Sequence, residues 1–114
     1  MLKTIPELMQ EVSPHVRCVE GAVGAAERAQ NNGLLVDVRE TSEHLAKPVA
    51  GAINMPRGVV EMKMLELEKD PARPIYLHCA SAVRARLAAE QLQRIGYTNV
   101  TVLTCGVDTL QQCF

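Results

Sequence analysis

The 114-residue sequence predicts an α/β fold: a mostly parallel five-stranded sheet flanked by helices on both faces. Short apolar or β-branched runs alternate with helical patterns along the whole chain, and this order is typical of parallel strands joined by crossover helices. Two of the runs, residues 34–38 and 74–78, are almost continuously apolar. Such runs are typical of strands that are covered on both faces of a parallel sheet.

Five strands and five helices are expected, and all but the second and third strands are separated by a helix. The expected strands are residues 16–19, 34–38, 51–56, 74–78 and 99–104. The expected helices are residues 4–11, 21–30, 59–68, 83–95 and 107–112. Thr4 and Glu7 have the spacing of a capping box at the start of the first helix. Asn31, Asn32 and Gly33 are expected to end the second, because asparagine and glycine tolerate the left-handed conformation.

Residues 83–95 form the strongest helical pattern, which Gly96 is placed to end. Small and apolar residues recur on one side of this helix, at Ala85, Ala88, Ala89 and Leu92. The pairs Arg86–Glu90 and Glu90–Arg94 have the i,i+4 spacing of helical ion pairs. In the helix expected at residues 59–68, the corresponding apolar stripe is Val60, Met64 and Leu67.

Length and charge narrow the class of protein. The chain suits one domain over residues 1–114, with residues 1–13 as an N-terminal helical extension. The formal net charge is −1, so no general attraction to nucleic acid or to an anionic membrane is expected. There is no signal-peptide pattern and no apolar stretch near the roughly 20 residues of a spanning helix. These features predict a cytoplasmic protein without nucleic-acid or membrane partners.

The four cysteines are Cys18, Cys79, Cys105 and Cys113, and no two of them form a C-x-x-C pair. A thioredoxin-type redox site is therefore not expected. The histidines show no zinc-ligand spacing, so neither a metal nor a cofactor is expected. In a cytosolic chain of this size, free thiols are the better interpretation than disulfides.

Cys79 is the candidate nucleophile because it follows a predicted buried strand and precedes the N-terminus of a predicted helix. Ligands of parallel α/β sheets bind at the carboxyl ends of the strands. The backbone N–H groups of the loop, the helix dipole and the nearby Arg84 and Arg86 would all stabilise a thiolate or a persulfide anion there. A nucleophile held in its charged form needs no general base.

Four ordered segments resemble the rhodanese family, and the resemblance runs from about Val16 to Gly106. The segments are LLVDVRE at 34–40, VAGAINMP at 49–56, IYLHC at 75–79 and GYTNV at 96–100. In that family the loop cysteine accepts a sulfane sulfur and passes it to a nucleophile. The resemblance implies a sulfurtransferase that takes sulfur from a donor such as thiosulfate or a polysulfide and passes it to a thiophilic acceptor. Its expected partners are a small-molecule sulfur donor and acceptor, or a sulfur-relay protein. It makes Cys79 the catalytic residue and gives substrate binding to the loop residues Ala80, Ser81, Ala82, Val83 and Arg84.

Three departures from the family pattern leave other functions open. Ala82 stands where the loop usually has glycine, Ala80 and Ser81 offer no charge to a donor, and Cys105-Gly106 replaces a usual Gly-Gly. A non-catalytic module that binds a partner or senses sulfide is one alternative. A cysteine phosphatase or arsenate reductase of related fold is another, although its loop is one residue longer than the four residues between Cys79 and Arg84.

The remaining polar candidates are expected to have structural roles. Asp37 and Arg39 should pair and brace the loops at the end of their strand. His78 should point away from Cys79, since side chains alternate along a strand. His15 and His44 are interpreted as surface residues. Cys105 follows the last strand, where it can either pack or serve as a resolving thiol.

Overall fold

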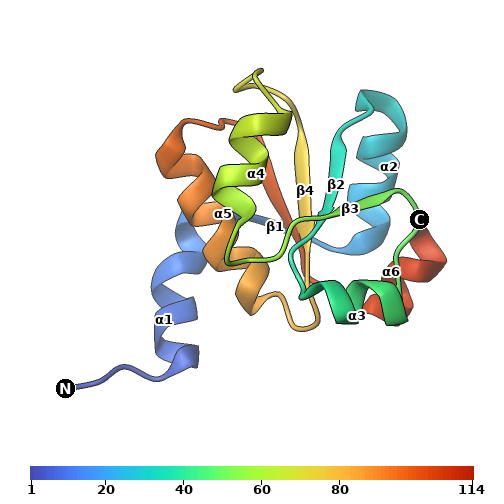
Figure 1. The fold of residues 1–114 in the computed structure, drawn as a ribbon. Coiled ribbons are helices and arrows are strands. Elements are labelled where there is room, and N and C mark those ends of the chain that lie inside the picture. The colour runs from blue at the N-terminus through green and yellow to red at the C-terminus, as the bar shows by residue number, and fades with distance from the viewer.

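A computed structural model, which describes all 114 residues, contains one five-stranded sheet with strand order β1-β5-β4-β2-β3 (Figure 1). Every neighbouring pair is parallel, so the predicted fold class is confirmed and the sheet is wholly parallel. The strands are β1 (Arg17–Val19), β2 (Leu34–Asp37), β3 (Ala52–Asn54), β4 (Ile75–His78) and β5 (Val100–Leu103).

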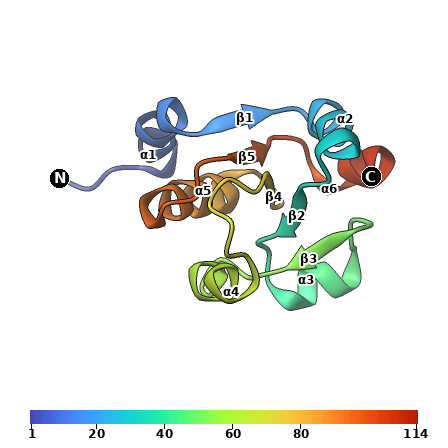
Figure 2. The ribbon, with the colours of Figure 1, turned by 90° about the horizontal axis from the view of Figure 1, so that it is seen from above.

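Helices cover both faces of the sheet. They are α1 (Ile5–Val12), α2 (Gly21–Asn31), α3 (Thr41–Ala46), α4 (Val60–Leu67), α5 (Val83–Ile95) and α6 (Val107–Cys113), and a 3₁₀ turn, Ser13–His15, follows α1. Figure 2 shows α1, α4 and α5 on one face and α2 and α6 on the other. Helix α3 lies at the edge where β2 and β4 end (Figure 1). None of the helices has the length and apolar character needed to cross a membrane.

Local signals in the sequence located most of these elements. Helix α5 has the predicted bounds, and all four residues of its predicted apolar side are buried. The capping box of α1 is present: the Glu7 N–H donates to Thr4 Oγ1 and the Thr4 N–H donates to Glu7 Oε1, both at 3.3 Å. Helix α2 ends at Asn32, whose φ of 55° is left-handed as expected.

Three local expectations were wrong. Helix α3 was not predicted, because it has only six residues and no apolar stripe. The helical ion pairs that Glu90 was expected to form with Arg86 and Arg94 are absent from the ion pairs of the structure. Leu67 is 52% exposed, so the buried side of α4 consists of Val60 and Met64.

The core has two parts, one on each face of the sheet. Ile75, Leu77 and Cys79 belong to the larger cluster, under α5, whereas Tyr76 belongs to the smaller one. This alternation places His78 on the face opposite Cys79, as predicted. On that second face α2 packs closely on the sheet: a Cβ at Gly24 would lie 2.4 Å from Leu103 Cδ2.

Candidate active site

Cys79 lies directly after β4, at the edge where the parallel strands end, and the next residues turn into α5 (Figure 1). Its side chain is fully buried within the larger core cluster. The Sγ atom accepts a hydrogen bond of 3.4 Å from the N–H of Ala85, in the first turn of α5. The N-terminus of a 13-residue helix is thus directed at the sulfur, where it stabilises negative charge.

The loop between Cys79 and the body of α5 presents a series of uncommitted backbone donors. The first intrahelical bond runs from the Arg86 N–H to the Ala82 carbonyl, at 3.0 Å. The N–H groups ahead of it have no helical acceptor and make no other bond to the protein; they belong to Ala80, Ser81, Ala82, Val83 and Arg84. Successive free N–H groups around one point form an anion-binding concavity.

Ala82 adopts the left-handed conformation that the usual glycine at this position suggests. Its φ is 64° and its ψ is 1°, and the residue is buried. Alanine in this region costs of order 1 kcal/mol relative to glycine, because its Cβ crowds the backbone. The turned form of the loop therefore has a cost in folding free energy. The methyl group of Ala82 packs into the larger core.

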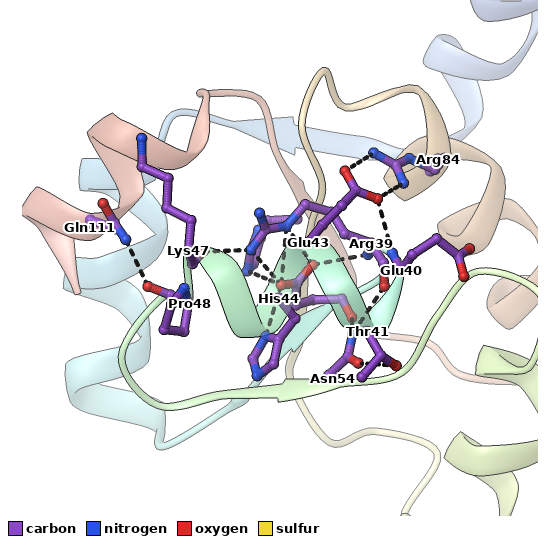
Figure 3. Close-up of polar contacts among 12 residues, drawn as sticks. Arg39, Glu40, Thr41, Glu43, His44, Lys47, Pro48, Asn54, Arg84 and Gln111 are labelled. Carbon is purple, nitrogen blue, oxygen red and sulfur yellow. Dashed lines mark hydrogen bonds and ion pairs between the residues drawn. The ribbon is translucent and has the colours of Figure 1, made fainter.

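Arg84 is held by a residue that the sequence did not single out. Its Nη1 and Nη2 atoms donate to Glu43 Oε1 and Oε2 at 2.7 and 3.1 Å (Figure 3). This bidentate pair raises the pKa of Arg84 and lowers the pKa of Glu43. Of the two roles considered for Arg84, anion binding or bracing, the geometry favours bracing. Glu43 was missed because it lies on α3, 41 positions from its partner.

Helix α3 is in turn fixed to the end of β2 through Asp37. Arg39 Nη2 lies 2.7 Å from Asp37 Oδ2, and both side chains are buried, which confirms their expected pairing. Burial alone would raise the pKa of Asp37, but the hydrogen bonds from Arg39, together with the effects of His78 and His44, hold that pKa below its ordinary value. Asn54 also donates to the carbonyls of Asp37 and Arg39, at 3.1 and 3.0 Å, so β3 joins this support.

His44 was expected on the surface, and this expectation was wrong. Its side chain is 18% exposed, and Nδ1 lies 3.0 Å from Asp37 Oδ2 (Figure 3). The error follows from missing α3, since it is this helix that turns His44 toward the carboxylate. His15, in contrast, is exposed as expected.

His78 is the most unusual polar residue near the site. It is fully buried, neither ring nitrogen has a hydrogen-bond partner, and Nε2 lies 3.9 Å from Asp37 Oδ2. Burial lowers the pKa of His78 to about 4, and the charges of Arg39 and His44 act in the same direction. The imidazole is therefore neutral near pH 7, and it faces away from Cys79.

The surface cavities lie away from Cys79. There are three, of about 310 to 330 Å³, and none is lined by Cys79 or by its loop. In this conformation the sulfur is closed off from solvent, so a donor reaches it only when the loop moves. Ala80 and Ser81 form the exposed part of that loop.

Comparison with known proteins agrees with this architecture. The family model described as "Rhodanese-like domain" matches residues 22–113, which covers every strand after β1 and the whole Cys79 loop. The chain belongs to the rhodanese-like family.

Relatives among curated proteins are 30 to 35% identical to this chain over 72 to 74 aligned residues. The uncharacterized protein YqhL of Bacillus subtilis is 35% identical over 72 residues, or 63% of this chain and 56% of that protein. A protein of Allochromatium vinosum named sulfurtransferase is 31% identical, over 65% of this chain and 67% of its own. The putative sulfur carrier protein YrkF of B. subtilis is 30% identical over 64% of this chain, which is only 38% of that protein.

Solved structures match over a larger part of the chain. A Rhodopseudomonas palustris protein of unknown function, described as a possible tyrosine phosphatase, has a TM-score of 0.81 at 19% identity, over 98% of this chain and 92% of its own. Reduced Bacillus anthracis CoADR-RHD has a TM-score of 0.70 at 28% identity, over 89% of this chain and 17% of its own. At 19% identity, the first likeness establishes the fold alone.

Proposed function

We propose that this rhodanese-like domain is a sulfurtransferase in which Cys79 carries the transferred sulfur as a persulfide. The observation that carries the proposal is the position of Cys79 Sγ, which accepts the Ala85 N–H and adjoins a loop of uncommitted N–H groups. This arrangement supplies partial positive charge to an anionic sulfur without a general base. The names of two relatives, a sulfurtransferase and a putative sulfur carrier, support the same class of activity.

The proposed reaction has two balanced steps. The Cys79 thiolate attacks the outer sulfur of thiosulfate, so that a Cys79–S–S⁻ persulfide forms and sulfite leaves with the electron pair of the broken S–S bond. A thiophilic acceptor, such as a thiolate or cyanide, then attacks the outer persulfur and regenerates the Cys79 thiolate. With a polysulfide donor, the leaving group of the first step is the shortened polysulfide. Loop N–H groups hold the charge that moves onto the outer sulfur.

The charge of the site favours a singly charged donor. Arg84 is already paired with Glu43, and Ala80 and Ser81 are neutral. A dianion such as thiosulfate therefore meets N–H dipoles with no free side-chain cation on the loop. We expect faster loading by a small persulfide, whose reacting sulfur carries one negative charge, or by the persulfide of a sulfur-relay protein.

We also place the protein in the cytoplasm. All four cysteines are free thiols, and reducing compartments preserve thiols in that state. A persulfide carrier depends on this, because a Cys79 trapped in a disulfide could not accept sulfur.

Intact mass spectrometry tests the proposal. After incubation with thiosulfate or polysulfide, wild type should gain one sulfur, about 32 Da, which a reductant removes. Cys79→Ser should abolish this gain, whereas Cys18→Ser should retain it. Cys18 is the control because it is another free thiol and lies on β1, outside the loop. Sulfur uptake by Cys79→Ser would refute the assignment.

The same protein preparations separate the alternatives. An arylphosphatase activity that depends on Cys79 would favour the phosphatase alternative, but Arg84 has both Nη atoms engaged by Glu43 and is not free to hold a phosphate. If wild type takes up no sulfur from any donor and hydrolyses no aryl phosphate, the non-catalytic binding module is the remaining function.

A further inference from the structure

A pair of cysteines, Cys105 and Cys113, lies beside the sheet, away from the Cys79 loop. Cys105 follows β5 and Cys113 ends α6, and both line a cavity of about 330 Å³ together with Gly21, Thr104 and Thr109. Both thiols are half-buried, whereas Cys79 is fully buried. Cys105 packs against the smaller core cluster and Cys79 belongs to the larger one, so the two sites are on opposite faces of the sheet.

The absence of a side chain at Gly21 brings the two sulfur atoms next to one another. A Cβ at Gly21 would lie 2.8 Å from Cys105 Sγ and 3.5 Å from Cys113 Sγ. Both sulfurs therefore face one point, and the distance between them cannot exceed the sum of these two lengths. A larger residue at position 21 would occupy the space between them.

The two thiols differ in their surroundings. Cys105 Sγ accepts a hydrogen bond of 2.7 Å from the N–H of Gly21, the first residue of the 11-residue helix α2. A helix N-terminus directed at a sulfur stabilises negative charge on it, and the thiolate is the reactive form of cysteine. Cys113 Sγ makes no such bond. Cys105 is therefore the better placed nucleophile, and Cys113 is the thiol within its reach.

We propose that Cys105 and Cys113 form a second thiol site, which reacts with small-molecule disulfides. The Cys105 thiolate attacks one sulfur of the disulfide RSSR, so that a Cys105–S–SR mixed disulfide forms and RS⁻ leaves. Cys113, after losing its proton to solvent, attacks Cys105 Sγ and expels the second RS⁻. The protein is oxidised by two electrons to a Cys105–Cys113 disulfide, and RSSR is reduced to two thiols. The cavity admits the small disulfide to Cys105, whereas Cys79 is closed off.

The test is the time course of intact mass after the reduced protein is mixed with glutathione disulfide and quenched with acid, with peptide mapping of each species. In wild type the first adduct should map to Cys105, and it should give way to a species two hydrogens lighter than the reduced protein. Cys113→Ser should accumulate the Cys105 adduct without closing. Cys105→Ser keeps an acceptor for the Gly21 N–H. In this variant the rate of adduct formation at the Cys105–Cys113 site should be at least about tenfold lower than in wild type.

Cys18→Ser is the matched control, since it removes another half-buried thiol outside the cavity and should react like wild type. Mapping the wild-type adduct decides the proposal even if a variant folds poorly. A first adduct on Cys79 or Cys18, or a Cys113→Ser protein whose adduct on Cys105 does not persist, would overturn it. Sulfur uptake by Cys79 is measured separately, so this inference and the proposed function fail independently.

Discussion

Cys79 and Cys105 each lie just after one of two neighbouring parallel strands, but they are on opposite faces of the sheet and differ in nearly everything else. Each follows its strand, β4 or β5, and each sulfur accepts an N–H from the first turn of a helix, α5 or α2. Cys79 is fully buried, and the five N–H groups that follow it along the chain make no bond to the protein. Cys105 is half-exposed, lines a cavity and has a second thiol beside it.

Under the two proposals above, a cysteine between a strand and a helix N-terminus does not by itself define one chemistry. The helix dipole stabilises charge at both sulfurs. What separates them is the shape around the sulfur: a closed loop of N–H donors suits a small sulfur anion, whereas an open cavity with a neighbouring thiol suits exchange with a disulfide. The residues next to Cys79 and its loop differ from those next to Cys105. Three of them, His78, Glu43 and Ala82, provide ways to test the comparison.

Acid should have the largest effect, and it should act through the Cys79 strand. His78 precedes Cys79, and its pKa of about 4 in the folded protein is below the ordinary 6.5. The unfolded chain therefore binds a proton that the folded protein excludes. The free energy of unfolding should fall as the pH drops from 6.5 to 4, by at most about 3 kcal/mol. Urea denaturation across this range measures the loss.

His78→Leu should flatten this part of the profile, because it replaces a buried imidazole without hydrogen bonds by an apolar side chain of similar size. The exposed His15 is the matched control, and His15→Leu should leave the profile unchanged. Below about pH 4 both variants should still lose stability, since the lowered pKa of Asp37 means that its protonation costs stability there. A wild-type profile that is flat from pH 6.5 to 4 would contradict the neutral, buried state of His78.

An intermediate effect is expected from Glu43→Gln, which releases the Arg84 guanidinium from its carboxylate partner. Free positive charge on the Cys79 loop should favour the dianion, so turnover with thiosulfate should rise relative to turnover with a small persulfide by up to about tenfold. The pair is about one-third exposed, so the accompanying loss of stability should be small. Disulfide exchange at Cys105 should not change.

Adding salt is the internal control for this variant. Screening should reduce the gain with thiosulfate more than any gain with the small persulfide, because a dianion feels the released charge more strongly. If thiosulfate turnover instead falls, then the bracing of the loop by Arg84 matters more than its charge.

The smallest effect is expected from Ala82→Gly. Glycine adopts the observed φ of 64° without the Cβ penalty, so turnover should rise by no more than about fivefold, the equivalent of 1 kcal/mol. Stability should change little, because relief of this strain is offset by the lost buried methyl group and by the greater entropy of the unfolded chain. Sulfur-transfer kinetics and urea denaturation measure the two quantities.

Asn32 offers a control, since it is the other non-glycine residue with positive φ and it ends α2 far along the chain from the loop. Asn32→Gly should leave sulfur transfer unchanged. If Ala82→Gly also leaves turnover unchanged, then the loop already holds its working shape, and the neutral Ala80 becomes the next position to vary, as Ala80→Arg.

The sequence alone was enough to predict what depends on neighbours along the chain. The alternation of apolar runs and helical patterns predicted all five strands, the bounds of α5 and the buried side of that helix, because periodicity and burial act over a few residues. The capping box of α1 and the left-handed end of α2 follow from the same local rules. The position of Cys79 between β4 and α5 is also a local feature, and the sequence alone was therefore enough to name Cys79 as the candidate nucleophile.

Tertiary structure decided which groups face those local elements. Glu43 and Arg84 are 41 positions apart, and Gly21 and Cys105 are 84 apart, so no pattern along the chain relates either pair. The short helix α3 lacks an apolar stripe, and it is its polar contacts that bring Glu43 to Arg84 and His44 to Asp37. Packing on opposite faces of one sheet closed the space around Cys79 and left it open beside Cys105, because burial depends on the whole fold rather than on neighbouring residues.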